Sequence, residues 1–238
     1  HFNASGMLEV KFYKDLKLTV NAGLTYMGAT NSEFTNAYYG DAAGIGRIDK
    51  TQFNRLAFMS NQLLEYNKMI DDHSIRVMVG HESNLTRTSQ MYGAMAHVAV
   101  KGGENVLEWG NAVQMTGMTS ATSTVTLESY LATASYIYKE RYGVTANYRA
   151  DGSSKFAKGH RWGHFGSVGA TWMFTNETFM EPIKDWIKNG KLRLSWGVLG
   201  NQSNINLNLY QDQYTIQYVD GTVAYVWEYK GNPDLTWE

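Results

Sequence analysis

Cysteine is absent from the 238 residues, and proline occurs only twice. The missing cysteine excludes a disulfide framework and a thiolate metal site. The scarcity of proline favours strands, because proline cannot donate a hydrogen bond to a β-ladder. No apolar run approaches the ~20 residues of a membrane-spanning helix, and no signal peptide is evident. The sequence begins at His1 instead of Met, which indicates a processed or partial chain.

The lack of an apolar helix leaves a membrane β-barrel open, because a barrel strand crosses the bilayer in ~9–11 residues, of which only alternate ones are apolar. Aromatic residues make up 13% of the chain, with 16 Tyr and 7 Trp. Barrels concentrate Tyr and Trp at the two membrane interfaces. The net charge of -1 gives no basic footprint for a nucleic acid.

Strict alternation of apolar and polar residues is clearest at Leu16–Met27, and it follows a shorter alternating run at Leu8–Phe12. A period of two indicates strands, and the Lys14-Asp15 step between the runs predicts a tight hairpin. The same pattern predicts strands at Gln52–Asn67, Ser74–Thr88, Thr126–Asp151 (a hairpin turning at 139–141), Gly163–Thr175 and Lys191–Gly200.

The connections alternate in predicted length. Tight turns fall near residues 14, 71 and 140, and long polar segments fall at about 28–50, 89–123, 152–162 and 200–222. Short turns at one end and long loops at the other are typical of an outer-membrane barrel. One whole face of many strands is polar, which fits a polar lumen with a lipid-facing outside. Asn176–Gly190 breaks the pattern, and it predicts a short helix or a compact turn.

Seven segments in the second half of the chain resemble the barrel of the SusC/RagA family of TonB-dependent transporters. They are Tyr136–Tyr142, Asn147–Phe156, Arg161–Phe165, Ser167–Trp172, Asn176–Met180, Lys191–Gln202 and Asn232–Glu238. Their succession in this order is specific, whereas residues 1–135 carry only the strand pattern. At position 166 this chain has Gly, whereas the family is expected to have Pro. The difference affects only a local turn.

The resemblance implies an all-β, antiparallel transmembrane barrel of 22 strands, closed by an N-terminal plug domain. A strand with its share of turn and loop takes ~20 residues, so residues 1–238 supply about ten strands, roughly half of the barrel. The plug and the TonB-contacting segment lie outside this sequence. The implied location is the bacterial outer membrane, among lipid and lipopolysaccharide. The implied function is active import of oligosaccharides or peptides, with TonB and a SusD-like surface lipoprotein as partners.

Candidate site residues fall into two groups. Tyr38, Tyr39 and Trp109 lie in predicted long loops, where aromatic faces can stack on sugar rings or peptide side chains, or pack between loops. The family signature residues have an expected structural role. They are Asp151, Gly152, Ser153, Ser154, Phe156, Gly200, Asn201, Gln202, Asn232, Pro233 and Asp234.

The remaining motifs indicate no enzyme, no metal and no cofactor. His160 and His164 have the i, i+4 spacing of helical metal ligands, but Trp162 and Gly163 between them favour strand and loop. A basic run at Lys155, Lys158, His160 and Arg161 could meet lipopolysaccharide phosphates or form a solvated loop face. Two other functions remain open at this point: a passive pore or adhesin on a smaller barrel, and a soluble carbohydrate-binding β protein.

Overall fold

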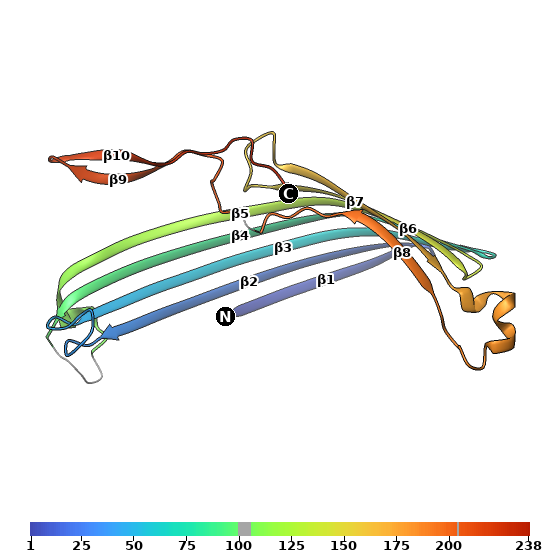
Figure 1. Cartoon of the computed structure of the whole chain (residues 1–238), viewed down its shortest axis with the longest axis horizontal. Coiled ribbons are helices and arrows are strands. Elements are labelled where there is room, and N and C mark those ends of the chain that lie inside the picture. Colours follow the sequence, from blue (N-terminus) through green and yellow to red (C-terminus); the bar gives the residue numbers. More distant parts are fainter. Residues whose placement is uncertain (100–105, 204) are drawn as a thin grey trace. The chain divides into compact units, whose positions relative to one another are not determined.

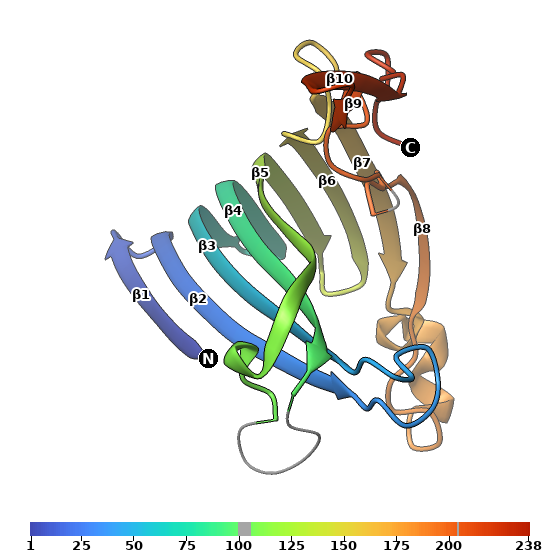
Figure 2. The same ribbon diagram turned by 90° about the vertical axis from the view of Figure 1, so that its left-hand side faces the viewer.

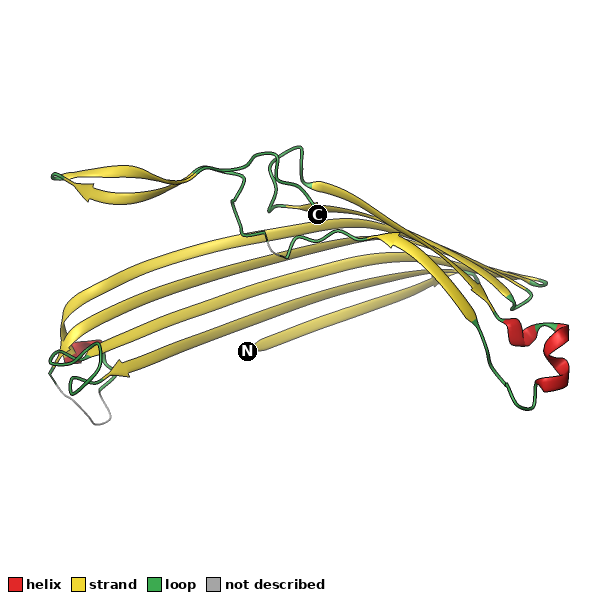
Figure 3. Cartoon of the chain, in the orientation of Figure 1, coloured by secondary structure: helices red, strands yellow, loops and turns green. Residues whose placement is uncertain are grey.

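The computed structural model describes residues 1–99, 106–203 and 205–238. Strands dominate these residues, and the helical segments are short 3-10 turns (Figure 3). The strands are labelled in Figure 1. They are β1 (Phe2–Phe12), β2 (Leu16–Thr35), β3 (Arg47–Ile70), β4 (His73–Val98), β5 (Ala112–Tyr138), β6 (Tyr142–Ser153), β7 (Trp162–Trp172), β8 (Leu192–Val198), β9 (Gln213–Val219) and β10 (Thr222–Tyr229).

Strands β1 to β8 form one sheet in chain order, whereas β9 and β10 pair with each other. The registers of β5 with β6, β6 with β7 and β7 with β8 are antiparallel, and Figure 2 shows β6 and β7 between β5 and β8. Strands β1 and β8 end the order and, within the described residues, do not pair with each other. The predicted all-β, antiparallel class is confirmed, and the sheet is open.

By their contacts, the residues fall into two compact units. Unit 1 comprises His1–Ala4, Gly23–Phe58 and Leu85–Thr124, and unit 2 comprises Ser5–Ala22, Met59–Asn84 and Val125–Glu238. Strands β1 to β5 contribute residues to both units, and the later strands lie in unit 2.

The sheet of unit 2 has two chemically different faces. Residues that pair across antiparallel strands share a face, and successive residues alternate. The registers of β5 to β8 therefore define an apolar face. Its large side chains are Tyr130, Tyr136, Tyr138, Tyr142, Val144, Tyr148, Trp162, Val168, Trp172, Leu192, Leu194, Trp196 and Val198, and Glu128 and His164 are its polar exceptions. The opposite, polar face carries Ser129, Thr133, Ser135, Thr145, Asn147, Arg149, Asp151, Ser167, Thr171, Arg193 and Ser195, and its apolar exceptions include Leu131, Ile137 and Phe165. The face predicted to be polar is thus mainly polar across four paired strands.

Each tight turn of unit 2 is hydrogen bonded to a neighbouring turn or to a neighbouring strand near its end. The amide of Asn67 donates to the carbonyl of Asp15 at 2.8 Å, and that of Lys139 donates to Asp72 at 2.8 Å. The amide of Met173 donates to the carbonyl of Arg141 at 2.7 Å. These bonds satisfy backbone groups at the strand ends. The hairpin turns predicted near residues 14, 71 and 140 are confirmed.

Two predicted loops are largely strand, so their predicted bounds were wrong. Strand β2 runs on to Thr35 and β3 begins at Arg47, inside the predicted loop 28–50. Strands β4 and β5 enter the predicted loop 89–123, of which residues 100–105 lie outside the described residues. Ser and Thr occupy both faces around residues 119–126, so the alternation is invisible, although Thr remains a favourable strand residue. Strand β9 likewise enters the predicted loop 200–222, where residue 204 is outside the described part.

The connection from β7 to β8 forms two 3-10 helices, η2 (Phe174–Asn176) and η3 (Thr178–Ile183). Of the two predicted alternatives, the compact turn is formed, and Asn176 is the last residue of η2. Glu177 holds this compact turn together. Its Oε1 accepts hydrogen bonds from Tyr142 Oη and from Trp172 Nε1 at 3.0 Å, and its Oε2 lies 3.3 Å from Arg141 Nη1.

The hydrogen bonds from Tyr142 and Trp172, with the charge of Arg141, hold the pKa of Glu177 below its ordinary value. A carboxylate with a lowered pKa stabilises the fold above its unfolded pKa of about 4.3, and the stabilisation is lost as the pH falls through the lower folded pKa. We therefore expect the Glu177→Gln protein to lose less stability than the parent between about pH 5 and pH 3. Thermal unfolding in detergent at stepped pH measures this. Glu181→Gln, an exposed change in the same turn, should keep the parental slope, and equal slopes in all three proteins would contradict the assignment.

Unit 1 has its own small apolar core of Ile48, Val98 and Ala112, against which Phe34 and Met95 pack. Within the described part of the chain, no helix combines the length and the hydropathy needed to cross a bilayer.

Candidate functional site

Arg149 and Asp151 occupy alternate positions of β6, so both side chains lie on the polar face of unit 2. The register places Asp151 opposite Ser129 of β5, and Arg149 between Leu131 of β5 and Phe165 of β7. Polar and apolar side chains from three strands therefore meet around one arginine.

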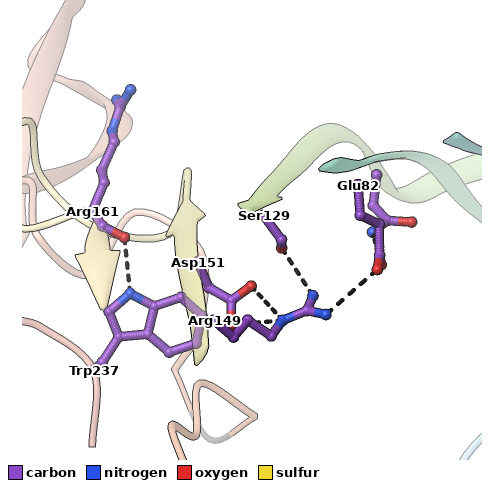
Figure 4. Close-up of polar contacts among 7 residues, drawn as sticks. Glu82, Ser129, Arg149, Asp151, Arg161 and Trp237 are labelled. Carbon is purple, nitrogen blue, oxygen red and sulfur yellow. Dashed lines mark hydrogen bonds and ion pairs between the residues drawn. The ribbon is translucent and has the colours of Figure 1, made fainter. Parts of the chain in front are cut away.

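Arg149 binds three side chains, as Figure 4 shows. Its Nε lies 2.7 and 3.0 Å from the two carboxylate oxygens of Asp151, and Nη2 donates to Ser129 Oγ at 2.9 Å. Its Nη1 lies 3.5 Å from Glu82 Oε2, which comes from β4. Ser129 is fully buried and Asp151 is 7% exposed, so the arginine satisfies groups that water reaches poorly. One cation faces two carboxylates, and the group carries a net charge of -1.

Beside this arginine lies a pocket of about 440 Å³. Its apolar surface comes from Leu131, Phe165 and Leu199. Its polar surface comes from Thr133, Asn147, Arg149, Asp151 and Ser167. Sites for small molecules have this size and combine an apolar lining with a few polar groups. We call this pocket, with the arginine and its partners, the polar-face pocket.

The signature residues after Asp151 tie the outgoing loop to distant segments. Ser153 Oγ donates to Gln202 Oε1 at 2.5 Å, and Lys155 Nζ donates to the Gln202 carbonyl at 3.1 Å. Ser154 Oγ accepts from the amide of Thr126 at 2.8 Å. Gly152 leaves room for Trp162, whose ring carbons would lie 2.9 Å from a Cβ at that position. This segment lies at the end of β6 and contacts residues of both neighbouring strands, Thr126 of β5 and Trp162 of β7.

Phe156 is fully buried in this part of unit 2. Its ring centroid lies 5.3 Å from that of Trp237, which lies 5.4 Å from the ring of Phe165. Trp237 Nε1 donates to the Arg161 carbonyl at 2.8 Å (Figure 4). Gly200 faces the same rings, because a Cβ there would lie 2.0 Å from Phe165 Cζ. Three aromatic rings from distant parts of the chain therefore form one cluster.

The other signature residues lie close to this aromatic cluster in the chain. Asn201 and Glu238 exchange two backbone hydrogen bonds, at 2.8 and 3.4 Å. Asn232 Oδ1 accepts from the amide of Asp234 across Pro233, and the Asn232 amide donates to Leu209. The structure thus links segments 151–156 and 200–202 directly and ties 232–238 to both. The structural role of these residues stays a prediction.

The loop aromatics lie in unit 1, away from the residues of this pocket in the chain. The amides of Tyr38 and Tyr39 both donate to Asn36 Oδ1, and their side chains are 69% and 74% exposed. Trp109 is 37% exposed, packs against Gly93 and lies 5.7 Å from Lys50 Nζ. These contacts account for the placement of Trp109 without a ligand, and a binding role for all three residues stays a prediction.

The sequence did not single out Glu82, Ser129 or the apolar lining of the pocket. Arg149 and Asp151 were visible as an alternating pair within the signature. The other lining residues lie on separate strands, and only a known register brings them together. In the predicted basic run, Arg161 Nε donates to the Phe156 carbonyl of the same loop, and Lys155 Nζ donates to the carbonyl of Gln202, which follows β8. Among the described residues, no group of three metal-ligating side chains occurs.

Replacing Arg149 tests whether its ion pairs with Asp151 and Glu82 stabilise the protein. Arg149→Met leaves Asp151 and Glu82 without their cation, and we expect the free energy of unfolding to fall by ~1–3 kcal/mol, since the guanidinium is partly exposed. Chemical unfolding of the protein in detergent measures the loss. Arg193→Met, an exposed change on the same face, is the control and should cost less than ~0.5 kcal/mol. If Arg149→Met/Asp151→Asn were no more stable than Arg149→Met alone, the ion pair would not be the source of the loss.

No protein-family model matches the chain. The chain is 28% identical over 198 residues to TonB-dependent receptor SusC of Bacteroides thetaiotaomicron. The matched region covers 81% of this chain and 18% of that protein. It is also 28% identical over 187 residues to TonB-dependent receptor P39 of Formosa agariphila, covering 76% of this chain and 17% of that protein. The chain therefore spans less than a fifth of the length of these curated relatives.

Among solved structures, the chain is similar to one described as the RagAB peptide transporter. The TM-score is 0.86 at 20% identity, over 99% of this chain and 26% of that one. The open-open state of the RagAB peptide importer gives a TM-score of 0.84 at 21% identity. These likenesses show a shared fold.

Proposed function

We propose that the chain belongs to the SusC/RagA family of TonB-dependent receptors, since it is 28% identical to two TonB-dependent receptors, and that it forms part of the barrel wall of an outer-membrane importer. The cargo we propose is an oligosaccharide or a peptide. The observation that carries this proposal is the two-faced sheet of unit 2, with an apolar and a polar face on the same four strands. A soluble barrel or sandwich places its apolar residues inside, whereas a membrane barrel turns them to lipid.

The aromatic residues of the apolar face support a membrane position. Trp162 and Trp172 mark the two ends of β7. Ten residue steps correspond to ~33 Å of strand, which at the ~40° tilt of barrel strands spans ~25 Å, the height of the apolar band of such barrels. Tyr130 stacks with Trp162, and Trp172 contacts Phe174 and Phe179, so each end carries several aromatic rings. On this proposal the polar face lines the lumen.

The remainder of the barrel and the plug domain lie, in our proposal, in parts of the protein outside residues 1–238. The curated relatives are more than five times as long as the segment they share with this chain. The open order of β1 to β8 is consistent with further strands that complete the 22-stranded ring. Closure removes the unpaired edges, which are costly in lipid.

The partners follow from the family. We propose that TonB energises transport through the plug, and that a SusD-like surface lipoprotein covers the barrel. We propose that the cargo contacts the polar-face pocket of unit 2 and, as separate positions, Tyr38, Tyr39 and Trp109 of unit 1. Support comes from the apolar and polar lining of the pocket and from the strong exposure of the two tyrosines.

Uptake in cells tests this function. We expect deletion of the whole gene to abolish uptake of at least one member of a panel of defined oligosaccharides and peptides, and plasmid-borne expression to restore it. Collapsing the proton gradient with a protonophore should abolish that uptake, because import depends on TonB. Uptake that survives the protonophore would indicate a passive pore. A protein recovered from the soluble fraction without detergent would contradict the membrane assignment.

A further inference from the structure

The β9–β10 hairpin presents six large apolar side chains on one face. The register pairs Tyr218 with Val223, Ile216 with Tyr225 and Tyr214 with Trp227. These six side chains are between 55% and 76% exposed. We call this surface the hairpin aromatic face. The opposite face carries smaller or polar residues, including Gln217 and Ala224.

The backbone conformation of the turn and the hydrogen bonds at the base define the shape of this hairpin. Asp220 and Gly221 have φ of 49° and 82°, the two positive values that a tight two-residue hairpin turn requires. At its base, the Gly231 amide donates to Asp212 Oδ1 at 2.8 Å, and the Asn232 amide donates to Leu209 at 2.9 Å. An isolated two-stranded hairpin is marginally stable in water, so burial of its apolar face would stabilise it substantially.

Its size and charge favour a protein as the covering surface. Four aromatic side chains of ~150–250 Å² each, with Ile216 and Val223, expose roughly 600 Å², close to the ~800 Å² per partner of a specific interface. Only Asp220 and Glu228 are charged within residues 213–229. Interface centres are poor in charge and rich in Tyr and Trp. Two acidic groups without a basic one do not favour the anionic surface of lipopolysaccharide.

The hairpin belongs to the connection that leaves β8 at the end opposite the tight turns. In an outer-membrane barrel the tight turns face the periplasm and the long connections face outside. We propose that the hairpin aromatic face is a docking surface for the surface lipoprotein that lids the barrel. This inference rests on the proposed function, and it identifies which part of the chain the lipoprotein contacts.

Site-specific photo-crosslinking in the full-length protein tests the inference. A photo-reactive aromatic amino acid replaces Tyr218 on the aromatic face or, as the matched control, Gln217 on the opposite face. The lipoprotein that copurifies from native outer membranes is first identified by mass spectrometry. We expect position 218 to crosslink to it at least tenfold more than position 217. Crosslinks from position 218 to the same polypeptide or to lipid would overturn the inference.

The second measurement is the affinity of the purified lipoprotein for the full-length protein. Tyr218→Ser/Tyr225→Ser should weaken binding of the purified lipoprotein at least tenfold and leave the unfolding temperature of the barrel unchanged, whereas Gln217→Ser/Ala224→Ser should preserve binding. Unchanged affinity in the first variant overturns the inference while the proposed function stands. If no lipoprotein copurifies with the native protein, the partner proposed for the importer fails, and the inference fails with it.

Discussion

The Ala146→Lys protein should fold into membranes less stably than the parent by ~2–4 kcal/mol, the cost of a lysine near the bilayer midplane on the lipid face of a barrel. Ala146 is exposed on the apolar face, where it pairs with Ala134 and with Val168, near the middle of β7. Lipid contacts this side chain in our account, and the ammonium group would lose its hydration there.

Thr145→Lys is the matched control, because Thr145 is the adjacent residue of the same strand and lies on the polar face. It gives up one hydroxyl contact with Ser135, at 3.2 Å, and the new charge meets water. We expect a loss below ~1 kcal/mol. Folding into lipid vesicles at increasing urea concentration measures both variants. Equal losses, or a larger loss for Thr145→Lys, would show that the faces are assigned wrongly.

The second large effect is expected at Phe156. Truncation to alanine removes a fully buried ring from its contact with Trp237 and leaves a cavity. Such changes cost ~3–5 kcal/mol of unfolding free energy. The loss should appear as a lowered midpoint of chemical unfolding of the full-length protein in detergent.

Phe179→Ala makes the same chemical change at a ring that is 63% exposed, and it should cost less than ~1 kcal/mol. A comparable loss in both variants would mean that general loss of aromatic surface, and not the cluster around Trp237, determines stability. A negligible loss for Phe156→Ala would remove the cluster as a stabilising element.

The strands that the sequence predicted well are those with one apolar and one polar face. Tyr142–Tyr148 alternates strictly, and β6 follows this alternation. The beginning of β5 was missed because Ser and Thr occupy both faces around residues 119–126 and erase the period. The end of β4 was missed because apolar and small residues occupy both faces between Met91 and Val98. An alternating sequence pattern arises when one face of a strand is more buried than the other. In these segments the two faces differ little in residue type, so no alternation is visible.

The candidate site could be predicted only in part, for a different reason. Arg149 and Asp151 share a face by their spacing alone, but their partner Glu82 lies 67 residues from Arg149 along the chain. Trp237 lies 76 residues from the Arg161 carbonyl that it binds. Such contacts depend on strand order and register, which local patterns do not specify.

The central claim is that one face of this sheet meets lipid and the other meets water. Residues 1–238 contain no cysteine, so once any cysteine elsewhere in the full-length protein is replaced, single cysteines at successive positions 142–149 of β6 can each carry a spin label. The measurement is the collision rate of each label with oxygen, which concentrates in lipid, and with a water-soluble nickel complex. Our account predicts high oxygen accessibility at Tyr142, Val144, Ala146 and Tyr148, and high nickel accessibility at Gly143, Thr145, Asn147 and Arg149. Equal nickel accessibility at all positions, or an inverted alternation, would contradict it.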